Sequence, residues 1–216
     1  TGTITVTNNI NITGTAAEVA AALGNIDTFA GSPTATLSNA HTLAELKAIN
    51  NATSGTITLD NYSVALTGST ADIKAALAGT FADTYTGNIT ITDADATDIA
   101  ATDITVIEGD TDGTITVSNN IDINGTAAEV AAAVDDVDTF SGTPTATLSN
   151  AHTLAELKAI NNAISGTITL NEYTVALAGT SSDLAAALAG TFDDTYTGNI
   201  TITDTPTDAQ RALIDA

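Results

Sequence analysis

The chain has 216 residues, of which 26 are Asp or Glu and only four are Lys or Arg, so its formal net charge is −22. A charge of this sign and size argues against nucleic-acid backbones and anionic membranes as partners. Cysteine, methionine and tryptophan are absent, which excludes a disulfide framework, thiol chemistry and a soft metal site.

An internal duplication dominates the sequence. Residues 2–94 align with residues 113–205 without a gap at a constant offset of 111, and 21 of these 93 positions differ. The most strongly repeated stretch runs from His41 to Gly55 and returns from His152. We therefore predict two repeat copies, residues 1–112 with four strand-helix coils and residues 113–216 with the same coils cut short, in one continuous solenoid.

In chain order, each copy contains four short segments that alternate threonine with an apolar residue. In the first copy they begin at Thr3, Thr34, Thr56 and Asn88. A period of two predicts strands whose threonines face water and whose apolar residues face a core. Each segment follows Gly or Pro and ends near Asn or Asp, which favours turns. Further alternating runs at residues 10–12 and 62–66 predict second strands in the first and third segments.

A helix start follows each predicted strand. The capping box, in which a Thr hydroxyl and an acidic or amide side chain satisfy free amides, occurs five times. Ser69 with Asp72, and Asp95 with Asp98, are looser versions. Apolar residues three or four positions apart then give narrow stripes on alanine-rich helices. The five boxes are Thr15 with Glu18, Thr42 with Glu45, Thr126 with Glu129, Thr153 with Glu156, and Thr207 with Gln210.

These elements predict an α/β fold, an open repeat solenoid of β-α and β-β-α coils with a largely parallel sheet. Neighbouring strands lie about 4.8 Å apart whereas helices need about 8–10 Å, so consecutive helices cannot all lie on one flat sheet. An extra strand in every second coil, or a curved sheet, would relieve this crowding. A closed barrel of eight β-α units also fits the count, but threonine would line its interior, where packed branched apolar residues are expected, so the open solenoid is preferred.

Two histidines are the first candidates for chemistry. His41 and His152 occupy one repeat position, each just before a helix cap, and no Ser, Cys or second His is placed to form a catalytic triad with either. We interpret both as structural corners and expect neither catalytic nor cofactor-binding residues, so the chain is not expected to be an enzyme.

Carboxylates spaced two residues apart suggest calcium. Asp93 with Asp95, and Asp110 with Asp112, lie in predicted turns at this spacing, although the pattern lacks a complete EF-hand loop. The alternative is that these aspartates are solvated turn residues. Calcium is therefore a candidate ligand and no other cofactor is predicted.

The threonine pairs form the other candidate surface. Stacked in register, they would make a T-x-T ladder similar to those of solenoid ice-binding proteins, which bind a regular surface. The alternative is that threonine is simply a good polar strand former. The pairs are Thr3 and Thr5, Thr34 and Thr36, Thr56 and Thr58, Thr90 and Thr92, Thr114 and Thr116, Thr145 and Thr147, Thr167 and Thr169, and Thr201 and Thr203.

The phrases TLAELKAINNATSGTITL and GTAAEVAAAL resemble the tandem repeats of very large secreted surface proteins of cyanobacteria and other Gram-negative bacteria. This resemblance covers almost the whole chain and implies an extracellular, frequently calcium-associated array for adhesion, surface coating or motility. The predicted function is a non-catalytic structural or adhesive repeat segment of a surface or filament-forming protein, acting as a spacer or stalk. Expected partners are neighbouring repeats or a second copy docked end to end, without nucleic acid or membrane insertion.

Overall fold

The computed structural model describes residues 2–215, in which eight helices alternate with short strands. The chain divides into two compact units. The first holds the residues up to Thr92 together with Val106–Ile115, and the second holds Asp93–Thr105 together with the residues from Thr116 onward. Helix α4 (Ala101–Gly109) and strand β9 (Ile115–Val117) contribute residues to both units.

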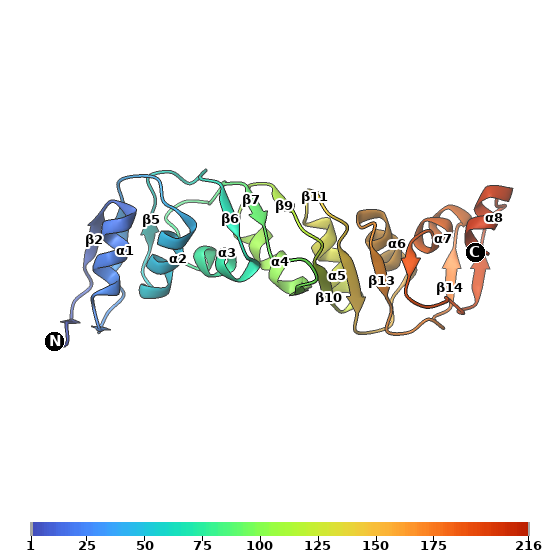
Figure 1. Ribbon diagram of the computed structural model, residues 1–216, viewed down its shortest axis with the longest axis horizontal. Helices are drawn as coiled ribbons and strands as arrows, with labels where there is room; N and C mark the ends of the chain where they lie inside the picture. Colours follow the sequence, from blue (N-terminus) through green and yellow to red (C-terminus); the bar gives the residue numbers. More distant parts are fainter. Residues whose placement is uncertain (1, 216) are drawn as a thin grey trace. The chain divides into compact units, whose positions relative to one another are not determined.

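The first unit contains three complete helices, each directly preceded by a strand. Helices α1, α2 and α3 lie side by side in chain order (Figure 1). Its strands form the parallel ladders β1-β3, β2-β4-β5 and β6-β7. The elements are β1 (Thr5–Val6), β2 (Asn11–Gly14), α1 (Ala16–Gly24), β3 (Thr28–Phe29), β4 (Thr34–Leu37), α2 (Leu43–Ala52), β5 (Ile57–Thr58), β6 (Leu66–Gly68), α3 (Thr70–Leu77) and β7 (Ile89–Ile91).

The second unit repeats this arrangement with four complete helices, α5 to α8, again packed in chain order. Its parallel ladders are β8-β10-β12-β13-β15, β9-β11 and β14-β16. The elements are β8 (Asp98–Ala100), β10 (Asp122–Gly125), α5 (Ala127–Asp135), β11 (Thr139–Phe140), β12 (Thr145–Leu148), α6 (Leu154–Ala163), β13 (Thr167–Thr169), β14 (Leu177–Gly179), α7 (Ser181–Leu188), β15 (Thr191–Phe192), β16 (Ile200–Ile202) and α8 (Asp208–Ile214).

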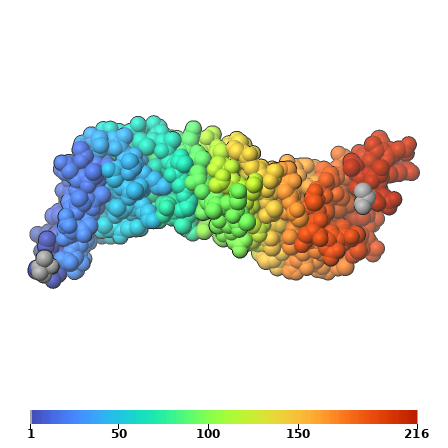
Figure 2. All heavy atoms as spheres, in the orientation of Figure 1, coloured from blue at the N-terminus to red at the C-terminus, as the bar shows by residue number. Residues whose placement is uncertain are grey.

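The predicted division between wet and buried faces is present in the strands. In β4, Ala35 and Leu37 are buried whereas Thr34 and Thr36 are only half-buried, and β12 repeats this pattern. The helices bury one narrow stripe each, such as Leu46 and Ile49 in α2. Within each unit, the colours in Figure 2 follow one another in order, so successive coils are in contact along the chain. The core of each unit is therefore formed by the buried strand residues together with the buried helix stripes.

All five predicted capping boxes are confirmed. In each, the Thr hydroxyl accepts the backbone N–H three residues ahead, and the side chain at that position accepts the N–H of the Thr. Ser69 caps α3 by accepting the N–H of Asp72, without the reciprocal bond of a full box. Hydrogen bonds from the Thr15 backbone and hydroxyl lower the pKa of Glu18. The local sequence thus fixes where these helices begin.

A glycine precedes several threonine strands because the coils approach too closely there for a side chain. A Cβ built on Gly55 would overlap the carbonyl of Pro33, and a Cβ on Gly166 would overlap that of Pro144. Both obstacles are backbone atoms, which cannot move without shifting a whole coil. These glycines permit the stacking of consecutive coils.

Replacing Gly55 by Ala is expected to destabilise the protein by about 1–3 kcal/mol, the usual cost of overpacking a tight contact. Gly24, at the end of α1, has no atom within 4 Å of a built Cβ. Gly24→Ala is therefore the matched control, with an expected gain of up to about 1 kcal/mol from helix propensity. Urea denaturation of both variants measures the two effects, and equal stabilities would contradict the close approach at Gly55.

The predicted α/β class with parallel sheets is confirmed, and the strand orders within the described residues close no barrel. The sequence left open which strands lie side by side. Strand β4 lies between β2 and β5, whereas β1 pairs with β3 and β7 pairs with β6. The threonine strands are thus distributed over separate ladders instead of one continuous ladder, and the short strands β3, β11 and β15 each pair with one of them at the edge of a sheet.

The helix start predicted at Asp95 and Asp98 is also wrong. Asp98 begins strand β8, which pairs with β10, and helix α4 starts only at Ala101. Ala96, which lies two residues before strand β8, has a φ of 59°, a left-handed conformation that is uncommon for a non-glycine residue. The amide of Ala96 donates to the carbonyl of Asn120 at 2.7 Å. Pairing with the next coil therefore overrides the local capping signal.

Candidate functional site

The most enclosed polar cluster of the first unit joins His41 to Tyr85. His41 follows β4 and is buried, and Tyr85, which precedes β7, is among the largest fully buried side chains. The Nε2 of His41 lies 3.2 Å from the Tyr85 hydroxyl, and that hydroxyl donates to the carbonyl of Val64 at 2.5 Å. The Tyr85 hydroxyl therefore contacts both His41, 44 residues earlier in the chain, and the backbone of Val64, which lies between them in the sequence.

The hydrogen-bond pattern determines the tautomer of His41. The single proton of the Tyr85 hydroxyl is used in the bond to Val64, so the hydroxyl can only accept from the imidazole. The proton of neutral His41 is therefore on Nε2, and Nδ1 has no hydrogen-bond partner among the described residues. Burial lowers the pKa of His41, while the nearby carboxylate of Glu45 opposes this shift. The ring is thus held neutral.

The second unit contains the same cluster. The Nε2 of His152 lies 3.1 Å from the hydroxyl of Tyr196, which donates to the carbonyl of Val175 at 2.7 Å. Burial raises the pKa of the Tyr196 hydroxyl to about 12. No serine or threonine hydroxyl is hydrogen-bonded to either histidine within the described chain. The cluster fits a packing role.

Sequence reasoning singled out the histidines but missed their tyrosine partners. The signal was available, because a tyrosine follows each histidine at the same spacing of 44 residues in both copies. No local rule relates positions so far apart, however, and aromatic residues in a strand-rich chain are ordinarily core residues.

Half of the threonine candidates lie in two equivalent ladders. Thr36 and Thr58 are paired neighbours on β4 and β5, as are Thr147 and Thr169 on β12 and β13. Other candidates lie beside residues outside the predicted set, such as Thr90 beside Thr67 and Thr201 beside Ala178. The surface-binding role of the threonines stays a prediction.

The threonine patch is anchored by the strand before it. Both Thr34 and Thr36 donate to Oδ1 of Asn11, at 3.0 and 3.2 Å. In the second unit an aspartate replaces this asparagine, and Thr145 and Thr147 each donate to one of its two oxygens at 2.9 Å. These hydroxyls satisfy groups of the protein itself. The arrangement stabilises the coil interface whether or not a ligand binds.

The calcium candidates take part in turns. Oδ1 of Asp95 accepts the Asn120 N–H at 2.9 Å, and the carbonyl of Asp93 accepts from Nδ2 of Asn119 at 2.7 Å. The backbone amide of Asp112 donates to Tyr85, and burial raises the pKa of Asp110. Among residues 2–215, no three His, Asp or Glu side chains gather closely enough to hold a metal ion. Calcium binding stays a prediction from spacing.

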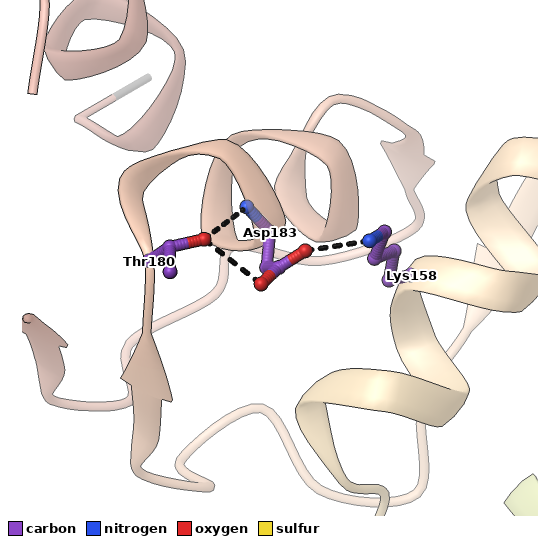
Figure 3. A network of polar contacts seen from close by, with 3 residues as sticks. All are labelled: Lys158, Thr180 and Asp183. Atoms are coloured by element: carbon purple, nitrogen blue, oxygen red, sulfur yellow. Dashed lines mark hydrogen bonds and ion pairs between the residues drawn. The ribbon is translucent and has the colours of Figure 1, made fainter.

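A charged contact joins helices α6 and α7 (Figure 3). Nζ of Lys158 lies 2.5 Å from Oδ1 of Asp183, whose other oxygen accepts the Thr180 hydroxyl at 2.8 Å. Thr180 in turn accepts the backbone amide of Asp183 at 3.2 Å, as the N-cap of α7. The first unit repeats the ion pair between Lys47 and Asp72. Two of the four cationic residues of the chain thus serve to join neighbouring coils.

The hydrogen bond from Lys158, followed by that from Thr180, lowers the pKa of the Asp183 carboxyl. Because the pKa of Asp183 is lower in the folded state, its carboxylate stabilises the fold at pH values above its pKa in the unfolded chain. This stabilisation is lost as the pH falls through the pKa of Asp183 in the folded state. In Lys158→Ala, the pKa of Asp183 measured by NMR titration is expected to rise toward that of an ordinary carboxyl. An unchanged titration curve would show that the ion pair does not form in solution.

Comparisons with known proteins add no relative, because no protein-family model and no curated protein matches this chain. Within the described part of the chain, every helix is too short or too polar to cross a lipid bilayer.

Proposed function

We propose that this chain is a non-catalytic structural repeat segment, an open solenoid of stacked β-α and β-β-α coils that acts as a spacer or stalk in a long extracellular surface or filament-forming protein. In such a structure each coil contacts only its neighbours, so stability is approximately a sum over coil interfaces and length is set by the number of repeats.

One observation carries this proposal: the same polar contacts between neighbouring coils occur in both copies. Asn39 accepts the Ala16 amide at 2.8 Å, and the equivalent bond in the second copy is 2.7 Å long. Asn50 donates to the Ala75 carbonyl at 2.8 Å, and its equivalent Asn161 donates to the Ala186 carbonyl at 2.6 Å. These partners are 23 to 25 residues apart, about one coil. A scaffold requires contacts that repeat at the spacing of one coil, whereas a single active site does not require them.

The chemistry of the enclosed groups supports a non-catalytic role. The buried histidines are neutral, and each is hydrogen-bonded to a tyrosine whose proton is already used in a backbone bond. A general base needs a substrate proton within reach, and a nucleophile needs an activating neighbour. The hydrogen bonds of His41 and His152 to their tyrosines favour neither role.

The extracellular location rests on the sequence. A net charge of −22 keeps long arrays soluble and apart, and the absence of cysteine suits an oxidising environment in which a free thiol would react. The resemblance to tandem repeats of secreted bacterial surface proteins points to the same location.

Lengthening the chain in register tests the spacer role. A variant in which residues 2–112 occur twice in succession has about 1.5 times the residues, and a solenoid is expected to grow in maximum dimension by nearly the same factor. A compact globule would grow only about 1.2-fold. Small-angle X-ray scattering measures the difference, and an unchanged cross-sectional radius is the internal control. Growth near the lower value would exclude a spacer.

A further inference from the structure

We propose that Asn61 is an acceptor site for N-linked glycosylation of the folded chain, with a nucleotide-activated hexose as the sugar donor. Asn61 lies in the connection between strands β5 and β6 of the first unit. This inference rests on the proposed function, because a bulky, solubilising sugar suits a chain that works at a surface.

The acceptor pattern Asn-x-Ser/Thr occurs six times in the sequence. A transferase that acts on a folded protein needs an exposed segment that can adapt to its active site, and such segments are connections outside helices and strands. Asn61 lies three residues after β5 and five before β6, whereas the other five asparagines lie in a helix or strand or directly beside one. They are Asn11 in β2, Asn51 in α2, Asn88 before β7, Asn124 in β10 and Asn199 before β16.

The groups of these other patterns are used in contacts between coils. Oδ1 of Asn11 accepts the hydroxyls of Thr34 and Thr36, at 3.0 and 3.2 Å. Thr53, the third residue of the pattern that begins at Asn51, is buried and donates to a backbone carbonyl of the preceding coil. The patterns beside β7 and β16 continue into paired strands. Modifying any of them would require part of the fold to open.

The pattern at Asn61 makes only local contacts. Both Asn61 and Ser63 are exposed, and Tyr62 and Ser63 form a turn. Oδ1 of Asn61 accepts the amide and the hydroxyl of Ser63, each at 2.8 Å. Within the described residues, no group accepts a hydrogen bond from Nδ2 of Asn61. The amide nitrogen that bonds to a sugar is therefore accessible, and the hydroxyl of the pattern already lies against the side-chain amide.

The reaction conserves atoms and charge without an oxidant or a reductant. Nδ2 of Asn61 forms a bond to the anomeric carbon of the hexose, and the bond from that carbon to the nucleoside diphosphate breaks. Nδ2 loses one proton to a base of the transferase, and the nucleoside diphosphate leaves with the electron pair. The protein contributes the exposed acceptor and the transferase contributes the catalysis.

The second copy keeps this turn and lacks the acceptor. Glu172 occupies the position of Asn61, and Thr174 occupies that of Ser63. The Thr174 hydroxyl donates to Oε1 of Glu172 at 2.8 Å, and both residues are exposed. The two copies therefore differ in the one group that the reaction needs, while the exposed turn around it is the same.

Exchanging residues between the copies tests the site. The full-length folded chain is incubated with nucleotide-activated glucose and a soluble N-glycosyltransferase that modifies a peptide of residues 56–66. Wild type is expected to gain one hexose at Asn61, and Asn61→Glu is expected to gain none. Glu172→Asn completes the pattern with Thr174 and is expected to gain a second hexose. Intact-mass spectrometry followed by peptide mapping measures the number and the positions of the sugars.

Ser63→Ala is the matched control, because it keeps the asparagine and removes only the hydroxyl, and it is expected to gain no hexose. Far-UV circular dichroism establishes that each variant is folded. A wild type that stays unmodified, sugars spread equally over all six patterns, or a Glu172→Asn variant without a second hexose would overturn the inference. If the lengthened chain nevertheless grows in scattering as a solenoid does, only the glycosylation site fails and the spacer role stands.

Discussion

Replacing Tyr85 by Ala is expected to lower the free energy of unfolding by about 3–5 kcal/mol, the range found for removing a buried aromatic side chain. Tyr85 is 1% exposed, and its ring lies 5.9 Å from that of His41 and 6.1 Å from that of Phe81. The substitution leaves a cavity and also removes the hydrogen-bond partner of the buried His41 imidazole and of the Val64 carbonyl. Urea denaturation measures the loss.

The repeat supplies the control. Tyr196 occupies the same position in the second copy and keeps its bonds to His152 and Val175, but its ring is only half-buried. Tyr196→Ala is therefore expected to cost clearly less than Tyr85→Ala. Tyr85→Phe, which keeps the ring and removes the hydroxyl, should cost about 1–3 kcal/mol for the unsatisfied buried groups. Equal losses for the two alanine variants would contradict the difference in burial.

Acidification from about pH 7.5 to about pH 5.5 is expected to destabilise the protein through its two histidines. Burial lowers the pKa of both His41 and His152 below the ordinary value of 6.5, so below that value the unfolded chain binds protons that the folded chain does not. The stabilisation that comes from the two neutral histidines is therefore fully present above pH 6.5. It decreases as the pH falls toward the pKa values of these histidines in the folded state. Each histidine contributes at most about 1.4 kcal/mol per pH unit.

The double variant His41→Leu, His152→Leu is the control for this pH effect, since it removes both titrating groups. Its stability is expected to be constant across the same interval, as followed by thermal melting. Half-buried Asp110, whose pKa is raised, acts with the opposite sign, because its contribution is lost as the pH rises through its folded pKa. A wild type that melts at one temperature throughout the interval would contradict the neutral, buried state of the histidines.

The sequence predicted the parts of the fold that depend on local signals. The Thr-x-x-Glu boxes located helix starts because both partners lie within one turn, and the alternation in Thr34–Leu37 identified the buried face. Periodicity indicates which side of a strand is buried but not which strand lies beside it, so the order of neighbouring strands could not be predicted. Two-residue strands such as β3 are too short to show a period. At Asp98, pairing with Asp122 decided the conformation against the capping signal.

The candidate site could be predicted only in part, for a similar reason. His41 attracted attention as one of two histidines, and its position before a helix cap indicated a structural corner. Its partner Tyr85 could not be derived from any local rule, because 44 residues separate them and the contact exists only once the coils are stacked.

Stacking of coils is the central claim, and the melting temperature of a single copy tests it most directly. If stability is a sum over neighbour interfaces, residues 1–112 alone lose the interfaces that the second copy supplies and melt at a markedly lower temperature than the whole chain. Differential scanning calorimetry of both proteins under the same buffer conditions makes the comparison. Equal melting temperatures would show that each copy is stable independently and would contradict a stacked repeat.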